Sequence, residues 1–123
     1  MANITAASLH FEGNFHGDLN TLLFRVDFTI QFRENEAQVQ FEEAARLREH
    51  DPDDDDLITA YPLPHKFNAG LSRTEDRFLK IVVLRDQTNT EIGTEELQGE
   101  VWLRRVGNNL ASSEVITPIL KFP

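Results

Sequence analysis

The chain has 123 residues, of which 40% are apolar and 27% charged, values that are ordinary for a globular domain and unlike those of disordered chains. A chain of this length can bury one independent core, so we expect a single domain over residues 1–123. The net charge of −9 leaves no basic face to neutralise phosphates, which argues against nucleic acid and anionic membranes as partners. The absence of cysteine excludes disulfides, a thiolate nucleophile and a cysteine zinc site.

The N-terminal residues have neither the basic region nor the apolar stretch of a signal peptide. No apolar run approaches the roughly 18 residues that a membrane span requires. We therefore expect a cytoplasmic or particle-associated protein without a membrane segment.

Alternation of apolar and polar residues predicts two strands in the first third of the chain. The first covers residues 5–11, where every second residue is apolar or threonine. The second is the segment TLLFRVDFTIQFR, in which six apolar residues share one parity: Leu22, Phe24, Val26, Phe28, Ile30 and Phe32. Because successive side chains of a strand point to opposite faces, this segment predicts a long strand with one buried face.

Residues 36–49 allow two interpretations. Helix-forming residues dominate the segment, and Asn35 with Gln38 resembles a capping box. Against this, four residues share the parity of a strand, a pattern that only Glu43 interrupts: Val39, Phe41, Ala45 and Leu47. We favour the strand, because it completes a regular all-β pattern and helix propensity is weak against tertiary context, but the helix remains open.

Four further strands are predicted in the rest of the chain. They cover residues 57–63, 77–85, 96–105 and 113–122. The segment from Arg77 to Arg85 is apolar on both parities, which predicts a central strand covered on both faces. Pro118 places the last strand at a sheet edge, because proline cannot donate a hydrogen bond to a neighbouring strand.

Seven strands joined by segments rich in glycine, asparagine, aspartate and proline predict an all-β fold, a two-sheet antiparallel β-sandwich. If consecutive strands run antiparallel, the connections at 13–20, 50–56 and 86–95 leave the sheets at one end and make it acidic. The opposite end would then collect basic residues, partly offset by acids: His65, Lys66, Arg73, Arg104 and Arg105.

The segment REHDPDDDDLITAY contains six carboxylates within eight positions and is the sharpest chemical feature of the sequence. A loop of this kind offers the oxygen ligands that calcium prefers. The EF-hand spacing fails, because from Asp51 it would require glycine at Asp56 and glutamate at Pro62. The remaining alternatives are a solvated loop that keeps sheet edges apart and a weak divalent-cation site.

The acidic segment resembles the calcium loop of C2 domains, which are antiparallel β-sandwiches. The resemblance rests on a strand that ends in alternating acids and on an Asp-Asp-Leu-Ile sequence that opens the next strand: Glu49, Asp51, Asp55, Asp56, Leu57 and Ile58. Thr59 stands where these domains usually carry glycine, and the facing segment 13–20 offers only Asp18. If a metal binds, we expect its ligands to be Asp51, Asp53, Asp55, Asp56 and Asp18.

No pattern of catalytic residues emerges from the sequence. The four histidines have no ligand spacing, no glycine-rich phosphate loop or nucleophile elbow is present, and we expect no carboxylate to be buried for acid–base work. We therefore expect a non-enzymatic structural or assembly subunit that self-associates, through its ends or edges, into a larger homo-oligomer or particle without a cofactor. A C2-like calcium-dependent binding domain using residues 49–56 and a small enzyme of unknown reaction remain the alternatives.

Overall fold

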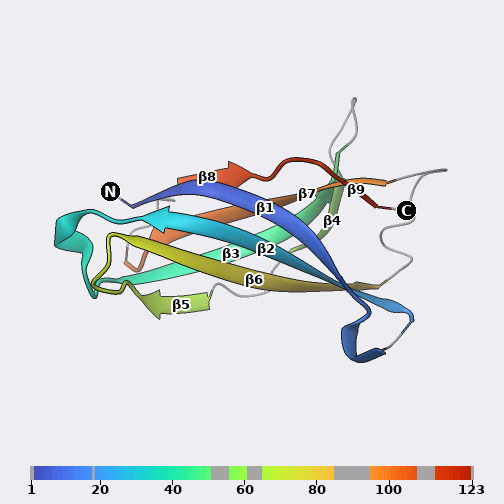
Figure 1. Ribbon diagram of the computed structural model, residues 1–123, viewed down its shortest axis with the longest axis horizontal. Coiled ribbons are helices and arrows are strands. Elements are labelled where there is room, and N and C mark those ends of the chain that lie inside the picture. Colours follow the sequence, from blue (N-terminus) through green and yellow to red (C-terminus); the bar gives the residue numbers. More distant parts are fainter. Residues whose placement is uncertain are drawn as a thin grey trace.

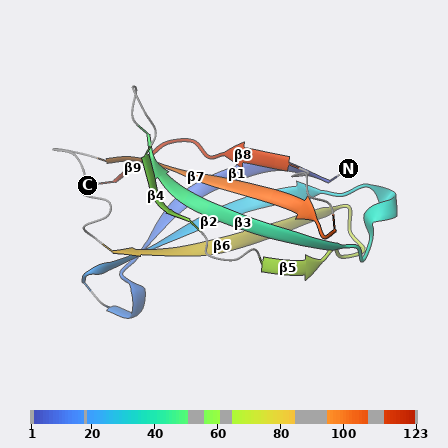
Figure 2. The ribbon, with the colours of Figure 1, turned by 180° about the vertical axis from the view of Figure 1, so that it is seen from behind.

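The computed structural model describes residues 2–17, 19–50, 56–60, 65–84, 95–107 and 113–122. These contain nine strands and two short 3₁₀ turns: β1 (Asn3–Gly13), η1 (Phe15–Gly17), β2 (Thr21–Gln31), η2 (Glu34–Glu36), β3 (Gln40–Glu49), β4 (Asp56–Ala60), β5 (His65–Asn68), β6 (Thr74–Leu84), β7 (Glu95–Arg105), β8 (Ser113–Ile116) and β9 (Leu120–Phe122). Two antiparallel sheets pack face to face, as Figures 1 and 2 show from opposite sides, which confirms the predicted all-β sandwich.

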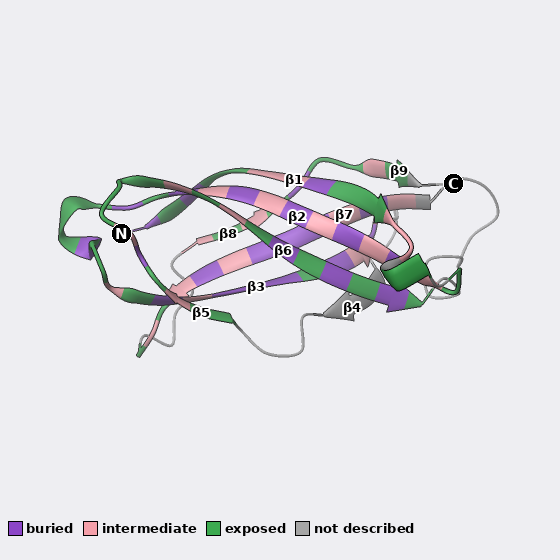
Figure 3. Ribbon diagram, turned by 60° about the horizontal axis from the view of Figure 1, so that its bottom comes forward, coloured by how far each residue is buried: buried purple, intermediate pink, exposed green. Residues whose placement is uncertain are grey.

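The smaller sheet, sheet A, has the strand order β1-β2-β6. Its central strand β2 shows the predicted alternation, with the side chains of the even-numbered residues from Leu22 to Ile30 buried and their neighbours half-buried (Figure 3). Strand β6 pairs with β2 over its whole length, from Thr21 opposite Leu84 to Gln31 opposite Thr74. The local pattern of β2 therefore fixes which face of all three strands packs into the core.

The larger sheet, sheet B, has the order β4-β3-β7-β8, with β5 paired to β3 and β9 paired to β7. Strand β3 is the interior strand onto which β4, β5 and β7 assemble. Its core-facing residues Phe41, Ala45 and Leu47 are buried against sheet A. The strand interpretation of residues 36–49 is thus correct from Gln40 onward, whereas Glu34–Glu36 form the 3₁₀ turn η2.

The sheets approach each other closely at Gly99 in β7. A Cβ atom at this position would lie 2.8 Å from Cγ2 of Val26 and 3.4 Å from Cγ2 of Thr117. The hydroxyl of the buried Thr117 accepts a hydrogen bond from the Gly99 N–H at 2.9 Å. Glycine is therefore required here by contact between the sheets.

Three details of the predicted strands are wrong. The segment 77–85 is predicted to be a central strand covered on both faces, but among the described residues β6 pairs only with β2, and its second apolar parity is exposed. The last predicted strand is two strands, β8 and β9, separated at Thr117–Ile119, where Pro118 interrupts the ladder. Strand β5 was not predicted, because its sequence HKFN is short and mostly polar.

Candidate functional site

The predicted metal ligands lie mostly outside the described residues. Asp18, Asp51, Asp53 and Asp55 are not described, and Asp56 is described only as the first residue of β4, opposite Glu49 at the end of β3. The acidic segment thus connects two neighbouring antiparallel strands, as the sequence predicted. The described residues contain no group of three or more histidine, aspartate or glutamate side chains placed to hold a metal ion, so the predicted site stays a prediction.

At the end of the molecule expected to be basic, positively charged side chains pair with acidic side chains of the same chain. Arg104 donates from Nε to Oε1 of Glu42 at 2.5 Å, and Nη2 of Arg73 lies 3.2 Å from Oε2 of Glu34. His65 contacts Glu43 through Nδ1 at 3.2 Å. Because Arg104 and Arg73 already have acidic partners, electrostatic attraction between the opposite ends of two molecules is weaker than the sequence alone suggests.

The outer face of β6 carries an exposed row of apolar side chains. Phe78, Val82 and Leu84 are 57%, 43% and 53% exposed, while Leu79, Ile81 and Val83 on the other parity are buried in the core. Two charged residues, Asp76 and Lys80, belong to the same face. Among the described residues β6 pairs only with β2, so this eleven-residue strand forms an edge of sheet A. Long apolar edge strands are the surfaces on which sheets of different chains pair.

An ion-paired cluster ties the β6 edge to sheet B. Arg77 turns toward the core side and donates to both carboxylate oxygens of Glu43, at 2.6 Å from Nε and 2.8 Å from Nη2. Its Nη1 donates to Oε2 of Glu75 at 2.6 Å, and its guanidinium lies 3.7 Å from the ring centroid of Phe67 on β5. Burial lowers the pKa of Arg77, but the hydrogen bonds to Glu43 and Glu75 outweigh it and raise the pKa above its ordinary value. The guanidinium is therefore always charged.

Glu43 itself is 1% exposed and lies on the core-facing parity of β3, between Phe41 and Ala45. Glu49 and Glu100 are buried as well, so the expectation that no carboxylate is buried for acid–base work is wrong as far as burial is concerned. Both oxygens of Glu43 are occupied by Arg77 and His65. A carboxylate whose two oxygens are both bound by side chains of its own chain is poorly placed to contact a substrate.

A groove of about 420 Å³ runs along the β6 edge. Its walls are five consecutive β6 residues, 76–80, together with Glu43 from β3 and His65 from β5. Residues of both parities line it, so the groove follows the edge of the strand. The edge of β6 is therefore accessible to another extended chain along this stretch.

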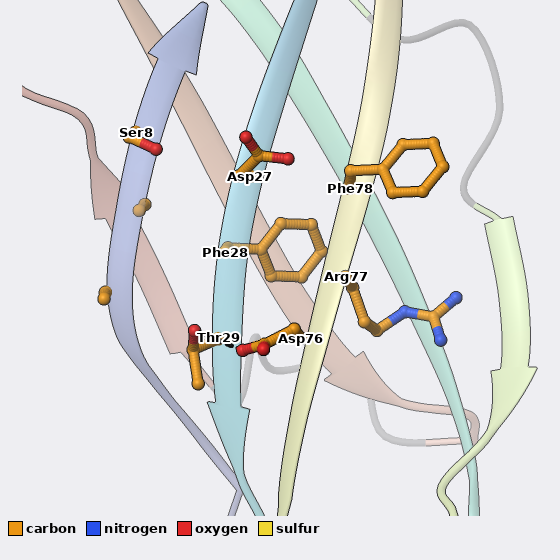
Figure 4. Close-up of a pocket in the computed structure, with 9 residues that line it drawn as sticks. Ser8, Asp27, Phe28, Thr29, Asp76, Arg77 and Phe78 are labelled. Carbon is orange, nitrogen blue, oxygen red and sulfur yellow. Dashed lines mark hydrogen bonds between the residues drawn. The ribbon is translucent and has the colours of Figure 1, made fainter.

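A second hollow of about 390 Å³ lies on sheet A and is lined by residues of β1, β2 and β6 (Figure 4). The residues that β1 contributes to its lining are small, Ala6, Ala7 and Ser8. Figure 4 shows the Arg77 and Phe78 side chains extending away from β2, toward the open edge. Asp76 instead accepts a hydrogen bond from the Thr29 hydroxyl at 2.8 Å.

Ser8, His10 and Asp27 meet beside this hollow but do not form a catalytic triad. Nε2 of His10 lies 2.9 Å from Oγ of Ser8 and 3.1 Å from Oδ2 of Asp27. A triad uses the two ring nitrogens separately, one for the nucleophile and one for the carboxylate. Here a single nitrogen serves both, and the imidazole is 47% exposed. The arrangement suits a surface polar network.

Sheet B carries a second charged cluster on its outer face, around Glu100. Arg46 donates from Nε at 3.0 Å and Arg48 from Nη1 at 2.7 Å to its carboxylate. Burial raises the pKa of Glu100, but hydrogen bonds with Glu114 and the two arginines lower it overall to about 2. The pKa of Glu114 is raised, chiefly by its hydrogen bond with Glu100 and by burial. As the pH falls, Glu114 therefore takes up a proton before Glu100 does.

Comparison with known proteins supports the fold and goes no further. No protein-family model matches the chain, and no curated protein matches it significantly. Among solved structures, it is similar to a Bacteroides uniformis beta-glucuronidase (TM-score 0.69, 10% identity) and to a calcium-binding mutant of Bacteroides uniformis beta-glucuronidase 2 with D341A and D367A (TM-score 0.66, 11% identity). Each match covers 98% of this chain but 14% of the other. The likeness shows a β-sandwich shared with part of these enzymes.

The sequence signals missed the features that the fold places at the β6 edge. The apolar residues Phe78, Val82 and Leu84 fit a strand covered on both faces as well as an edge strand, because both parities of the segment are apolar. Glu43 stood out only as a break in an apolar pattern.

Among the described residues, no helix is long and apolar enough to cross a membrane.

Proposed function

We propose that this domain is a non-enzymatic assembly subunit that self-associates through the edge of sheet A into a larger homo-oligomer. The observation that carries this proposal is the row of Phe78, Val82 and Leu84, exposed along an edge strand of eleven residues. In monomeric proteins, edge strands are usually short, charged or covered by another element, because an open edge presents unpaired N–H and C=O groups to other chains. Here the outer face of the edge is largely apolar.

The charges along β6 favour selective pairing over open-ended aggregation. Lys80 interrupts the apolar row, and Arg77 is held by Glu43 and Glu75 on the core side. A charged residue on an edge disfavours every register that leaves it beside a like charge or an apolar group. An edge of this composition supports one defined contact.

Light scattering on size-exclusion-purified protein tests the proposal. We expect a mass above the 14.1 kDa of one chain at micromolar concentration, falling to the monomer mass in Val82→Lys. Leu19→Lys is the matched control, because Leu19 is 72% exposed but lies in the turn before β2, at one end of the sandwich. A monomeric wild-type protein contradicts the proposal, and dissociation by Leu19→Lys alone moves the contact to that end.

Calcium-dependent binding of the C2 type is a second candidate. It is supported by the position of the acidic segment between Glu49 and Asp56, which are opposite each other on adjacent antiparallel strands. Calorimetric titration with calcium should give a dissociation constant no tighter than about 10⁻⁴ M if this loop behaves as a weak site. Binding that persists after Asp53→Asn and Asp55→Asn would place the ion elsewhere.

A further inference from the structure

We infer that the self-association proposed above is a two-fold contact in which β6 pairs antiparallel with β6 of a second copy, with Phe78 opposite Phe78. The inference rests on the proposed function and gives that contact its register. A two-fold axis perpendicular to sheet A joins the two sheets into one and keeps the outer faces on the same side. Residues that face each other across such an axis therefore have the same parity.

Charge complementarity selects the register. With Phe78 on the axis, Asp76 lies opposite Lys80 of the second copy, and the symmetry repeats this pair on the other side of the two aromatic rings. Moving the axis to Asp76 or to Lys80 brings like charges face to face, which opposes pairing. The chosen register also places Thr74 opposite Val82, so nine residues of each strand can form the ladder.

The described surroundings are compatible with this contact. The groove beside residues 76–80 leaves the strand edge open over the central part of the ladder. Asp76 and Lys80 make only weak contacts within the chain. Asp76 accepts a hydrogen bond from Thr29, and Nζ of Lys80 lies 3.7 Å from Oε1 of Glu12 and 5.9 Å from the ring centroid of Phe78. Both side chains can therefore turn to a partner without breaking a buried pair.

Cysteine cross-linking tests the register directly, because the chain has no cysteine of its own. Oxidised Phe78→Cys should form a covalent dimer rapidly, since directly opposite residues have Cα atoms within the range a disulfide spans. Val82→Cys is the control on the same face. In this register its two copies are separated by eight residue steps, about 26 Å at 3.3 Å per residue, and should not cross-link.

Charge exchange provides the second test. Asp76→Lys should weaken the dimer at least about tenfold, because each substitution creates two repulsive pairs, and Lys80→Asp should do the same. The double variant Asp76→Lys/Lys80→Asp should restore the wild-type dissociation constant. Thr29→Val, which removes the hydrogen bond to Asp76 without changing charge, should leave it unchanged.

The outcomes separate this inference from the proposed function. If the wild-type protein is an oligomer but Val82→Cys cross-links, the register is refuted while self-association stands. The same holds if the double charge exchange fails to restore the wild-type dissociation constant. A wild-type monomer at all accessible concentrations refutes both. Cross-linking confined to Phe78→Cys, together with restoration by the double variant, supports both.

Discussion

Breaking the Arg77–Glu43 pair should lower the free energy of unfolding far more than breaking an ion pair whose two side chains are both exposed. Glu43 is 1% exposed and receives two hydrogen bonds from Arg77, so Arg77→Met leaves a buried carboxylate with His65 as its remaining partner. Removing one member of a buried pair costs about 3 to 5 kcal/mol, because the other charge stays buried without compensation. The cost should be smaller for Glu43→Leu, since Arg77 is 21% exposed and keeps Glu75.

The double variant Glu43→Leu/Arg77→Met provides the decisive comparison. Replacing a buried pair with apolar residues of similar volume is often neutral, and the new side chain at position 77 would adjoin the ring of Phe67. We therefore expect the double variant to be more stable than Arg77→Met, with a coupling free energy of at least about 2 kcal/mol.

Urea unfolding followed by the fluorescence of Trp102, the single tryptophan, measures these changes. With a slope of about 2 kcal/mol per molar urea, Arg77→Met should lower the midpoint by roughly 1.5 to 2.5 M. Arg25→Met is the control, because Arg25 pairs with Asp27 and Glu12 on the surface and should cost less than about 1 kcal/mol. Equal losses for Arg77→Met and Arg25→Met, or additive losses in the double variant, would refute the reasoning.

Three further predictions concern packing and pH. Gly99→Ala should cost about 1 to 3 kcal/mol because its Cβ meets Val26 at 2.8 Å, and in a Val26→Ala background the same change should cost almost nothing. Phe28→Ala, which empties a core position 3% exposed, should cost about 3 to 5 kcal/mol, against less than about 1 for Asp27→Ala on the other face of β2; similar losses would contradict the assigned faces. The pKa of Glu100 is about 2 in the fold against an ordinary 4.5, so its contribution to stability is complete above about pH 4.5 and is lost as the pH falls toward 2. The difference in free energy of unfolding between wild type and Glu100→Gln should therefore shrink by about 1 to 3 kcal/mol between pH 6 and pH 2.5. A constant difference would show that this carboxylate has no shifted pKa.

The sequence by itself determined the strands and their buried faces where the two parities differ in polarity. In β2 the apolar parity from Leu22 to Ile30 is buried throughout, because a strand side chain can face only one of two surfaces and the core takes the apolar one. The same logic identified β3 from Gln40 onward against its helical composition. Local patterns also placed the acidic segment between two strands.

Only the tertiary structure decided which strand is an edge and which charges are buried. The β6 sequence is apolar on both parities, so it fits a central strand and an edge strand with an exposed apolar face equally well. The strand order of sheet A makes it an edge. The Glu43–Arg77 pair joins residues 34 positions apart, and β5 forms only because β3 offers it a partner. Such contacts depend on how the sheets are ordered and stacked, a property of the whole chain that a period of two along one strand does not encode.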